Sequence, residues 1–397
     1  MKVCIIGSGI VGLTVAREII NNFENIKIDL FDKNGFPSNG PSLNNSGVLH
    51  AGLYYPPNSL KSKLCIQGSN LLKEFSIENK LPLLKCGKIL VPHNKIDEVN
   101  LNNIYENAKD NGLVTNLIEY KEAVKMQSQI VKRDIYLYSP KTSVFSSNAI
   151  IKKIILELKE KNISFIKQKI IKIDGESGYA FTKCKNKYKY DFIYNLSGPS
   201  ALALYESDIQ NFSKYILQPF VGQYAELSTS FKIKTNIYPV PNPELPFLGI
   251  HLTPRFNQNA IVGPNALPYF FNEIDKKDIE DIKFIFSKFG INLLLLLTNK
   301  NSYRNHAFKE LTLNIRNKFL NSCNQFLEKK YFIEKSDINM NFSLSALRPQ
   351  LISRGNLKFV NDFVYYKRKK CIHLINAVSP AFTSSFALAK YLSKYIK

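Results

Sequence analysis

The sequence predicts an α/β protein with a Rossmann-like first domain, and three consecutive features near the N-terminus predict it. Residues 2–6 are apolar and β-prone, and they run into Gly7-Ser8-Gly9-Ile10-Val11-Gly12. Residues 13–20 carry apolar side chains at helical spacing, and residues 26–31 form a second apolar segment that ends at Asp32. A strand, a glycine turn, a helix, a second strand and an acid in this order are typical of a β-α-β unit that binds a dinucleotide.

The residues of this fingerprint have separate physical roles. Gly7 permits the tight turn, Gly9 lets the backbone approach a pyrophosphate, and Gly12 lets the helix pack closely on the strand. The pyrophosphate is expected at the helix N-terminus, where free N–H groups and the helix dipole favour negative charge. Asp32 lies 20 residues beyond Gly12 and is followed by Lys33. At this spacing the carboxylate is expected to accept the ribose hydroxyls.

Length and composition predict a soluble, cytoplasmic protein of two to three domains. The chain has 397 residues, of which 45% are hydrophobic. A typical domain has roughly 150 residues, so this length corresponds to two to three domains. Its longest apolar run, residues 293–297, is much shorter than the ~18 residues that span a bilayer, and the N-terminus does not resemble a signal peptide. Six cysteines without a C-x-x-C pair favour buried, reduced thiols over disulfides or a metal site.

The net charge of +22 does not by itself indicate a nucleic-acid partner. Only eight of the 54 basic residues are arginine, and the lysines are dispersed along the chain, whereas nucleic-acid surfaces concentrate charge on one face. The run at residues 367–370 lies between apolar segments at 363–366 and 371–375, which predicts a hairpin turn. Weak attraction to an anionic membrane surface is left open.

The segment after the second strand favours a flavin over a nicotinamide. An NAD domain would continue with another strand and helix, but residues 34–45 form a polar loop rich in Gly, Pro, Ser and Asn. The loop continues into Ser46-Gly47 and Val48-Leu49-His50. A small, glycine-bearing segment in this place suggests backbone laid against a flat ring.

Several long sequence blocks are distributed along nearly the whole chain. They are NSGVLHAGLYYPP at residues 45–57 with SLK at 59–61 and LC at 64–65, CGK at 86–88, YPVP at 238–241, PFLGIHLTPR at 246–255, VGPNA at 262–266 and NAVSPAFTSS at 376–385. In content and order these blocks resemble the L-2-hydroxyglutarate oxidase/dehydrogenase family, which consists of FAD enzymes of the D-amino-acid-oxidase superfamily.

The resemblance implies a Rossmann-like FAD-binding domain interleaved with an α+β substrate domain built on an antiparallel sheet. The FAD domain would comprise residues 1–85, 138–210 and 343–397, and the substrate domain residues 86–137 and 211–342. Residues 165–173 are expected to form one extended strand beside the adenine. Besides the fingerprint, the resemblance implies cofactor contacts from Asn45, Ser46, Gly47, Ile170, Ser197, Gly198, Ser379, Pro380, Thr383 and Ser384.

The C-terminal segment is expected to complete the cofactor site. Residues 386–392 have the apolar periodicity of a helix, and Thr383 or Ser384 is predicted as its N-cap. A helix N-terminus at the pyrimidine edge of a flavin would stabilise the negative charge of the reduced ring.

Three residues are candidates for the chemistry on the substrate. Oxidising an alcohol carbon needs a base that works near neutral pH, which suits histidine. His50 and His251 lie in family-like blocks, and which of them is the base stays open. A substrate carboxylate needs a bidentate cation, and Arg348 in the arginine–proline element at 348–349 resembles the superfamily's carboxylate ligand.

The resemblance implies oxidation of a 2-hydroxy acid, with L-2-hydroxyglutarate as the leading substrate and O2 or a membrane quinone as the electron acceptor. Three departures from the family pattern, at Asn44, at residues 221–224 and at residues 269–271, leave a monocarboxylic or more apolar 2-hydroxy acid open. An amine or amino-acid oxidase and an inactive flavin-binding protein are the alternatives. Residues 284–297 are expected to form a core helix pair or, alternatively, a peripheral contact with the inner face of the membrane.

Overall fold

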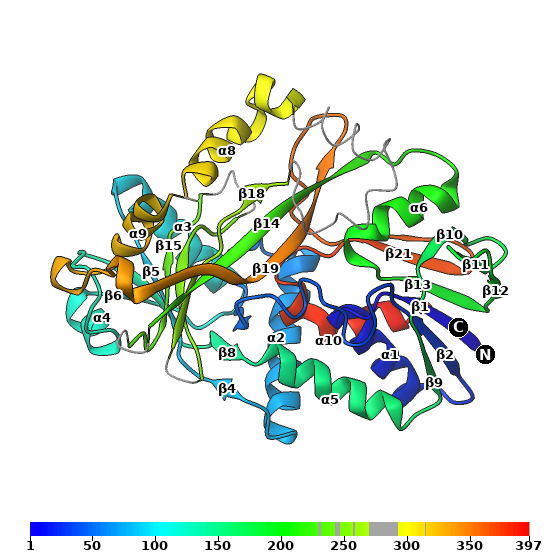
Figure 1. The fold of residues 1–397 in the computed structure, drawn as a ribbon. Helices are drawn as coiled ribbons and strands as arrows, with labels where there is room; N and C mark the ends of the chain where they lie inside the picture. The colour runs from blue at the N-terminus through cyan, green and yellow to red at the C-terminus, as the bar shows by residue number, and fades with distance from the viewer. Residues whose placement is uncertain (229–231, 243–246, 257–258, 270–292, 314, 397) are drawn as a thin grey trace. The chain divides into compact units, whose positions relative to one another are not determined.

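The computed structural model (Figure 1) describes residues 1–396 except 229–231, 243–246, 257–258, 270–292 and 314. The chain forms two compact units, each built from separated segments. Unit 1 comprises Met1–Leu83, Phe145–Tyr215 and Asn361–Lys397, and unit 2 comprises Leu84–Val144 and Ile216–Val360.

Unit 1 is organised around a six-stranded sheet in the order β20-β21-β13-β1-β2-β9. Five strands are parallel, and β20 pairs antiparallel with β21 at the edge. The strands are β1 (Lys2–Ile6), β2 (Lys27–Phe31), β9 (Ile163–Ile166), β13 (Phe192–Asn195), β20 (Val364–Lys367) and β21 (Cys371–Asn376). The basic residues 367–370 therefore begin at the last residue of β20 and form the turn that connects β20 with β21. This confirms the hairpin turn predicted from the apolar segments on either side.

Alternate side chains of β1 explain why this sheet is covered on both faces. Val3 and Ile5 belong to a core formed with four helices, whereas Cys4 and Ile6 belong to a second cluster on the other face. The helices are α1 (Ile10–Asn22), α2 (Leu60–Glu78), α5 (Ser147–Lys159) and α10 (Ala381–Ser393). The second face packs against the antiparallel sheet of β10 (Ile170–Asp174), β11 (Tyr179–Thr182) and β12 (Lys187–Lys189) and against α6 (Ala201–Ile209), which follows the short helix η1 (Gly198–Ser200).

Two expectations for unit 1 are wrong. Residues 165–173 do not form one strand, because β9 ends at Ile166 in the parallel sheet and β10 begins at Ile170 in the antiparallel sheet. Neither Thr383 nor Ser384 is an N-cap, because α10 begins at Ala381 with Pro380 as its N-cap. Both side chains are instead buried within the helix.

Unit 2 contains a mixed sheet in the order β18-β14-β17-β16-β15-β5-β7-β6, with β19 paired to β14. Along this order β5 pairs parallel with β15, whereas β14 with β17 and β18, β16 with β15 and β17, and β7 with β5 and β6 are antiparallel. The strands are β5 (Lys88–Val91), β6 (Asn116–Ile118), β7 (Tyr136–Ser139), β14 (Tyr215–Leu227), β15 (Asn236–Pro239), β16 (His251–Pro254), β17 (Ala260–Gly263), β18 (Leu267–Pro268) and β19 (Ile338–Ser353).

One face of the unit 2 sheet is an apolar core. Ile89, Ile237, Leu252 and Val262 pack there with side chains from α4 and α9. The remaining elements of the described residues are α3 (Lys95–Asp110), α4 (Tyr120–Met126), α8 (Tyr303–Thr312), α9 (Arg316–Asn324), the short helices η3 (Lys300–Ser302), η4 (Lys329–Tyr331) and η5 (Lys335–Asp337), and the short strands β3 (Val48–Leu49), β4 (Leu83–Leu84) and β8 (Ser143–Phe145).

The division into units differs from the expected domain bounds at all four boundaries, and by more than five residues at two of them. Residues 138–144 belong to unit 2, since β7 pairs with β5. Residues 343–360, which include Arg348, also belong to unit 2, because β19 pairs with β14.

The expectation for residues 284–297 falls partly outside the described residues, since only 293–297 of this stretch are described. Residues 293–298 are helical, with Leu295 buried and Leu297 exposed. Among the helices of the described residues, none is long and apolar enough to cross a membrane.

Candidate functional site

The glycine turn of unit 1 has no room for side chains. A Cβ on Gly12 would lie 1.8 Å from the carbonyl oxygen of Gly7, so only glycine lets α1 start directly against the turn. Gly7 has φ of +105°, and a Cβ there would lie 2.5 Å from the carbonyl oxygen of Leu196. A Cβ on Gly9 would meet Ser42 Oγ at 3.2 Å. The turn is therefore packed so closely that only glycine fits at positions 7 and 12, as in turns that hold a dinucleotide pyrophosphate.

Asp32 organises the same turn from the end of β2. One carboxylate oxygen accepts hydrogen bonds from Ser8 N at 2.8 Å and Ser8 Oγ at 2.9 Å, and the other accepts from Asn34 N at 2.8 Å. Lys33 beside it is exposed. Ser42 Oγ accepts the N–H of Ile10, the first residue of α1, at 2.9 Å. Ser8 and Ser42 were not recognised in the sequence, because their short side chains become informative only when the loop is folded.

Asn45 fixes the segment that precedes β3. Its Oδ1 accepts from Gly47 N and from Ser147 Oγ, both at 2.8 Å, and its amide donates to the carbonyl of Ser42. Ser46 and Gly47 are buried, and Gly47 has φ of +71°. The amide side chain therefore ties the Ser46–Gly47 backbone to α5.

The first turns of α10 contain a group of buried hydroxyls. Thr383 Oγ1 accepts the backbone N–H of His50 at 3.2 Å, and the carbonyl of His50 accepts from Cys65 Sγ. His50 is thus attached to both α10 and α2. Ser384 Oγ and Ser385 Oγ are buried and have no hydrogen-bond partner among the described residues. Ser379 is exposed and directly precedes Pro380, whose carbonyl accepts the N–H of Ser384.

Ser197 and Gly198 follow β13 at the start of η1, where Gly198 has φ of +57°. Ser197 Oγ donates to Asn195 Oδ1 at 2.7 Å. Ile170 is different, because its side chain is buried among the apolar residues beneath the sheet. Only its backbone remains as a predicted cofactor contact.

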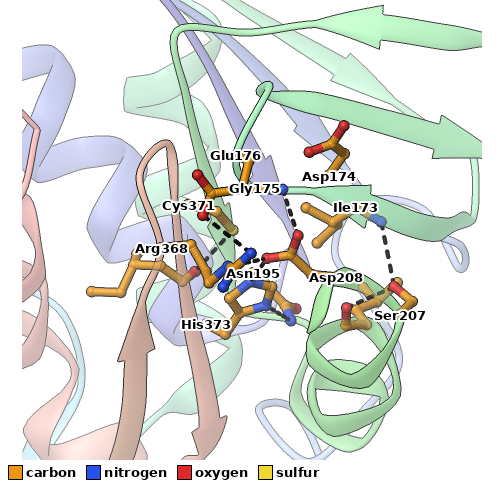
Figure 2. Close-up of polar contacts among 12 residues, drawn as sticks. Ile173, Asp174, Gly175, Glu176, Asn195, Ser207, Asp208, Arg368, Cys371 and His373 are labelled. Atoms are coloured by element: carbon orange, nitrogen blue, oxygen red, sulfur yellow. Dashed lines mark hydrogen bonds and ion pairs between the residues drawn. The ribbon is translucent and has the colours of Figure 1, made fainter. Parts of the chain in front are cut away.

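A buried polar network anchors the end of β13 (Figure 2). His373 Nε2 lies 3.0 Å from Asp208 Oδ2, and because a carboxylate accepts, Nε2 carries the proton and donates it. His373 Nδ1 then accepts from Asn195 Nδ2 at 3.0 Å. Gly175 N donates to Asp208 Oδ1 at 2.6 Å, and Arg368 lies 3.5 Å from Oδ2. Burial alone would raise the pKa of Asp208, but the hydrogen bonds from His373 and Gly175 and the charge of Arg368 lower it below its ordinary value.

We expect His373→Leu to destabilise unit 1 by about 3–5 kcal/mol, because it removes the hydrogen bond to Oδ2 of the buried Asp208 carboxylate. Thermal and urea unfolding of the FAD-loaded protein measure this loss. The double variant Asp208→Asn/His373→Leu has no buried charge and still offers an acceptor to Gly175 N–H, so it should lose less stability than the single variant. Equal losses in the two variants would contradict this account.

The second face of the unit 2 sheet is polar and buried. The register places Ile237 opposite Leu252, His251 opposite Gly263, and Ala225 opposite Val262. Since alternate residues point to opposite faces, Tyr238, His251 and Tyr224 share the face that is turned away from the apolar core. Tyr238, His251 and Tyr224 are each less than 5% exposed.

His251 has one nitrogen engaged and one available. Its Nδ1 lies 2.9 Å from the carbonyl oxygen of Gly249, which fixes Nδ1–H as the donor. Nε2 is buried and has no hydrogen-bond partner among the described residues. Burial, followed by the charges of Lys88 and Arg348, lowers the pKa of His251 to about 3. The imidazole is therefore neutral at pH 7, with Nε2 as a hydrogen-bond acceptor.

Arg348 is brought to the same face through Tyr224. Its Nη2 donates to Tyr224 OH at 2.9 Å, and the Tyr224 ring lies edge-on to His251 with centroids 6.4 Å apart. Gly263, between these strands, has no side chain to separate the two rings. Gly222 makes room for the guanidinium, because a Cβ there would lie 2.5 Å from Arg348 Nε. Of the three candidate catalytic residues, unit 2 thus brings together His251 and Arg348, whereas His50 lies in unit 1.

The residues present in unit 1 fit a dinucleotide cofactor: the glycine turn at the start of α1 carries no side chain at Gly7, Gly9 or Gly12, and α10 offers buried hydroxyls without partners among the described residues. A Rossmann-like unit with this loop, together with a second unit whose sheet bears a neutral histidine and an arginine, is typical of flavin-dependent oxidoreductases. The chain belongs to the FAD dependent oxidoreductase (DAO) family, whose model matches residues 2–395. It is an FAD-dependent oxidoreductase, and its cofactor is FAD.

Known relatives extend over nearly the whole chain. It is 31% identical to the mitochondrial L-2-hydroxyglutarate dehydrogenase of Caenorhabditis briggsae, covering 98% of this chain and 91% of the relative. It is 27% identical to the L-2-hydroxyglutarate dehydrogenase of Escherichia coli K12, with coverage of 98% and 91%.

Solved structures show the same fold. The L-α-glycerophosphate oxidase of Mycoplasma pneumoniae, with FAD bound, matches with a TM-score of 0.71 at 17% identity over 98% of this chain and 92% of that one. The glycine oxidase of Geobacillus kaustophilus matches with a TM-score of 0.73 at 13% identity over 99% and 93%.

Proposed function

We propose that the protein oxidises a 2-hydroxy acid to the 2-oxo acid, with L-2-hydroxyglutarate as its main substrate. The observation that carries the proposal is the arrangement of His251, whose Nε2 is an available acceptor on a face that also holds Arg348. The choice of substrate is supported by the relatives, which are L-2-hydroxyglutarate dehydrogenases. An arginine for a carboxylate and an acceptor nitrogen for a hydroxyl proton fit the same kind of compound.

Each residue has a defined task in this reaction. Arg348 pairs with the substrate carboxylate through its planar, bidentate guanidinium. His251 Nε2 accepts the proton of the substrate hydroxyl, while Nδ1–H stays on the carbonyl of Gly249 and keeps the ring oriented. FAD, when bound, would supply the acceptor for the hydride that leaves the hydroxyl-bearing carbon of the substrate, so that the alcohol loses one proton and one hydride. We assign the contacts with FAD to the glycine turn, Asp32, the Asn45–Gly47 segment, the Ser197–Gly198 turn and the start of α10.

The substrate itself favours proton transfer to His251. A base with a pKa of about 3 would be weak, but one of the causes of that low value is the positive charge of Arg348. A carboxylate paired with Arg348 neutralises this charge and therefore raises the pKa of His251 towards its ordinary value. Binding and base strength are coupled, so a 2-hydroxy acid is expected to react faster than the corresponding neutral alcohol.

The proposal is tested by mixing the purified yellow protein anaerobically with candidate substrates and following the flavin absorption. L-2-Hydroxyglutarate is expected to bleach the flavin faster than D-2-hydroxyglutarate, L-lactate or L-2-hydroxybutyrate. Bleaching by amino acids alone would replace the proposal with an amine oxidase. A flavin that none of these compounds reduces would indicate a flavin-binding protein without this activity.

We expect Arg348→Met to weaken substrate binding about 10- to 100-fold, the value of a charge-assisted pair of hydrogen bonds. Gly222→Ala should act in the same direction, because its Cβ would displace the guanidinium. FAD content should be unchanged in both variants, since both residues lie in unit 2. Titration of the oxidised flavin spectrum with 2-oxoglutarate measures the affinity. Unchanged affinity in Arg348→Met would remove Arg348 from the substrate site.

We also propose that the electrons pass to O2 or to a membrane quinone, and that the protein acts in the cytoplasm with peripheral contact at the inner face of the membrane. Exposed apolar side chains at Leu294, Leu297 and Phe308, close in sequence to Lys300 and Lys309, support such a contact. Reoxidation of the reduced flavin by O2 and by a short-chain quinone, with and without anionic vesicles, distinguishes the acceptors.

A further inference from the structure

Lys88 is a buried cation on the polar face of the unit 2 sheet. It is the first residue of β5 and is 1% exposed. Lysine is almost never this buried unless something in the interior stabilises its charge, because transferring an ammonium group out of water costs several kcal/mol. Because burying this charge is unfavourable, we expect the ammonium group of Lys88 to have a role that an apolar side chain could not fill.

The ammonium group of Lys88 lies against the ring of Tyr238. Its Nζ is 4.1 Å from the ring centroid. The imidazole of His251 is stacked on the same ring, with centroids 3.8 Å apart and planes inclined by 15°. Because β5 and β16 pair with opposite edges of β15, the cation and the imidazole approach the Tyr238 ring from opposite sides.

The strand register produces this arrangement. Tyr238 in β15 lies beside His251 in β16, because Ile237 is opposite Leu252 in an antiparallel pair. Lys88 in β5 is opposite Asn236 in a parallel pair, so its long side chain reaches Tyr238 on the same face, two residues along β15. Three adjacent strands each contribute one member.

Building on the proposed reaction, we propose that Lys88 is a positioning residue for His251 and acts through Tyr238. The cation holds the electron-rich ring by a cation–π interaction, which is stronger where both partners are removed from water. The ring in turn fixes the plane of the imidazole, so that Nδ1–H remains on Gly249 and Nε2 remains an acceptor. Lys88 does not touch the substrate in this arrangement, because the Tyr238 ring separates it from His251.

The charge of Lys88 has a second consequence for the same imidazole. Among the described residues, the charged and aromatic groups that bear on His251 are Lys88 from β5, Tyr238 from β15, Tyr224 from β14 and Arg348 from β19. After burial, the two cations are the causes that lower the pKa of His251. When a substrate carboxylate neutralises Arg348, Lys88 still opposes the protonated imidazole, and this favours release of the proton after turnover.

The test compares Lys88→Met, which keeps the length and loses the charge, with Lys88→Arg, which keeps the charge. The dependence of kcat/KM on pH reports the pKa values of the free enzyme. In Lys88→Met, the pKa that limits kcat/KM on the acidic side of the profile should rise by about one unit or more. At a pH below this pKa in both proteins, kcat/KM of the variant should therefore be roughly tenfold lower than that of the parent protein. Lys88→Arg should keep the parental limb. Substrate affinity at pH 8 should change less than about twofold in both.

A second pair of variants tests the ring. Tyr238→Leu removes the stack at similar volume and should lower the rate of flavin reduction about tenfold with little change in substrate affinity, whereas Tyr238→Phe keeps the ring and should retain the rate. A weaker substrate affinity in Lys88→Met with an unchanged pH profile would overturn the proposal and make Lys88 a substrate ligand. Equal rates in Tyr238→Leu and Tyr238→Phe would overturn it as well.

A measurement without turnover separates this proposal from the proposed function. Histidine-labelled protein, followed by NMR as a function of pH and assigned with a His251→Asn variant, gives the pKa of His251 directly. A raised pKa in Lys88→Met supports the positioning role even if no 2-hydroxy acid reduces the flavin. An unchanged pKa overturns it even if the protein oxidises L-2-hydroxyglutarate.

Discussion

Replacing His251 with asparagine is expected to slow flavin reduction by about 10²- to 10⁴-fold, the contribution of a positioned general base. The asparagine amide can still donate to the carbonyl of Gly249 in place of Nδ1–H, but it cannot take up the hydroxyl proton. FAD content and the affinity for 2-oxoglutarate should remain close to those of the parent protein. Rapid mixing with L-2-hydroxyglutarate under anaerobic conditions measures the rate.

His306 provides a matched control. It is also a buried histidine stacked on an aromatic ring, with its plane inclined by 15° to that of Phe247, and burial lowers its pKa to about 4. Its Nε2, however, is engaged with the carbonyl of Ala266. His306→Asn should therefore alter stability and leave the reduction rate nearly unchanged. If both histidine variants reduced the flavin at the parental rate, His251 would not be the base, and His50 would be the next candidate.

Gly12→Ala is expected to abolish FAD binding. The added Cβ would lie 1.8 Å from the carbonyl oxygen of Gly7, which no side-chain adjustment can relieve, so α1 must move away from the turn. The ratio of flavin to protein absorbance in the purified protein measures the loss. Gly40→Ala is the control, because a Cβ at Gly40 meets nothing within 4 Å. A yellow Gly12→Ala protein with normal FAD content would refute the assigned pyrophosphate site.

The β-α-β unit could be predicted because its determinants are local. Gly7, Gly9 and Gly12 are close in sequence, and each is needed for a steric reason that one chain segment reveals. The break between Ile166 and Ile170 could not be predicted, because both sides are β-prone and only their different partners, β2 and β11, separate them. The same holds for the start of α10 at Ala381, where burial of Thr383 against His50 outweighs the capping preference of its hydroxyl.

The candidate substrate site was only partly visible in the sequence. His251 and Arg348 could be named because their chemistry is scarce in this chain and their neighbours resemble a known family. Lys88, Tyr238 and Tyr224 were missed as site residues, because one lysine among many and two tyrosines among 21 carry no local signal. Strand pairing over more than a hundred residues brings them to one face, and pairing of that range is not encoded in any short pattern.

The interleaving of the segments also constrains how the protein is made. A nascent chain that has reached residue 360 contains all the described strands of unit 2, but it lacks β20, β21 and α10. Without α10, the apolar side chains of α1 and α2 that pack against it are exposed, and Thr383 is not yet present to fix His50. The core of unit 1 can therefore form only late in synthesis, so uptake of FAD should be post-translational. Until then, chaperones would meet the exposed apolar faces of α1 and α2.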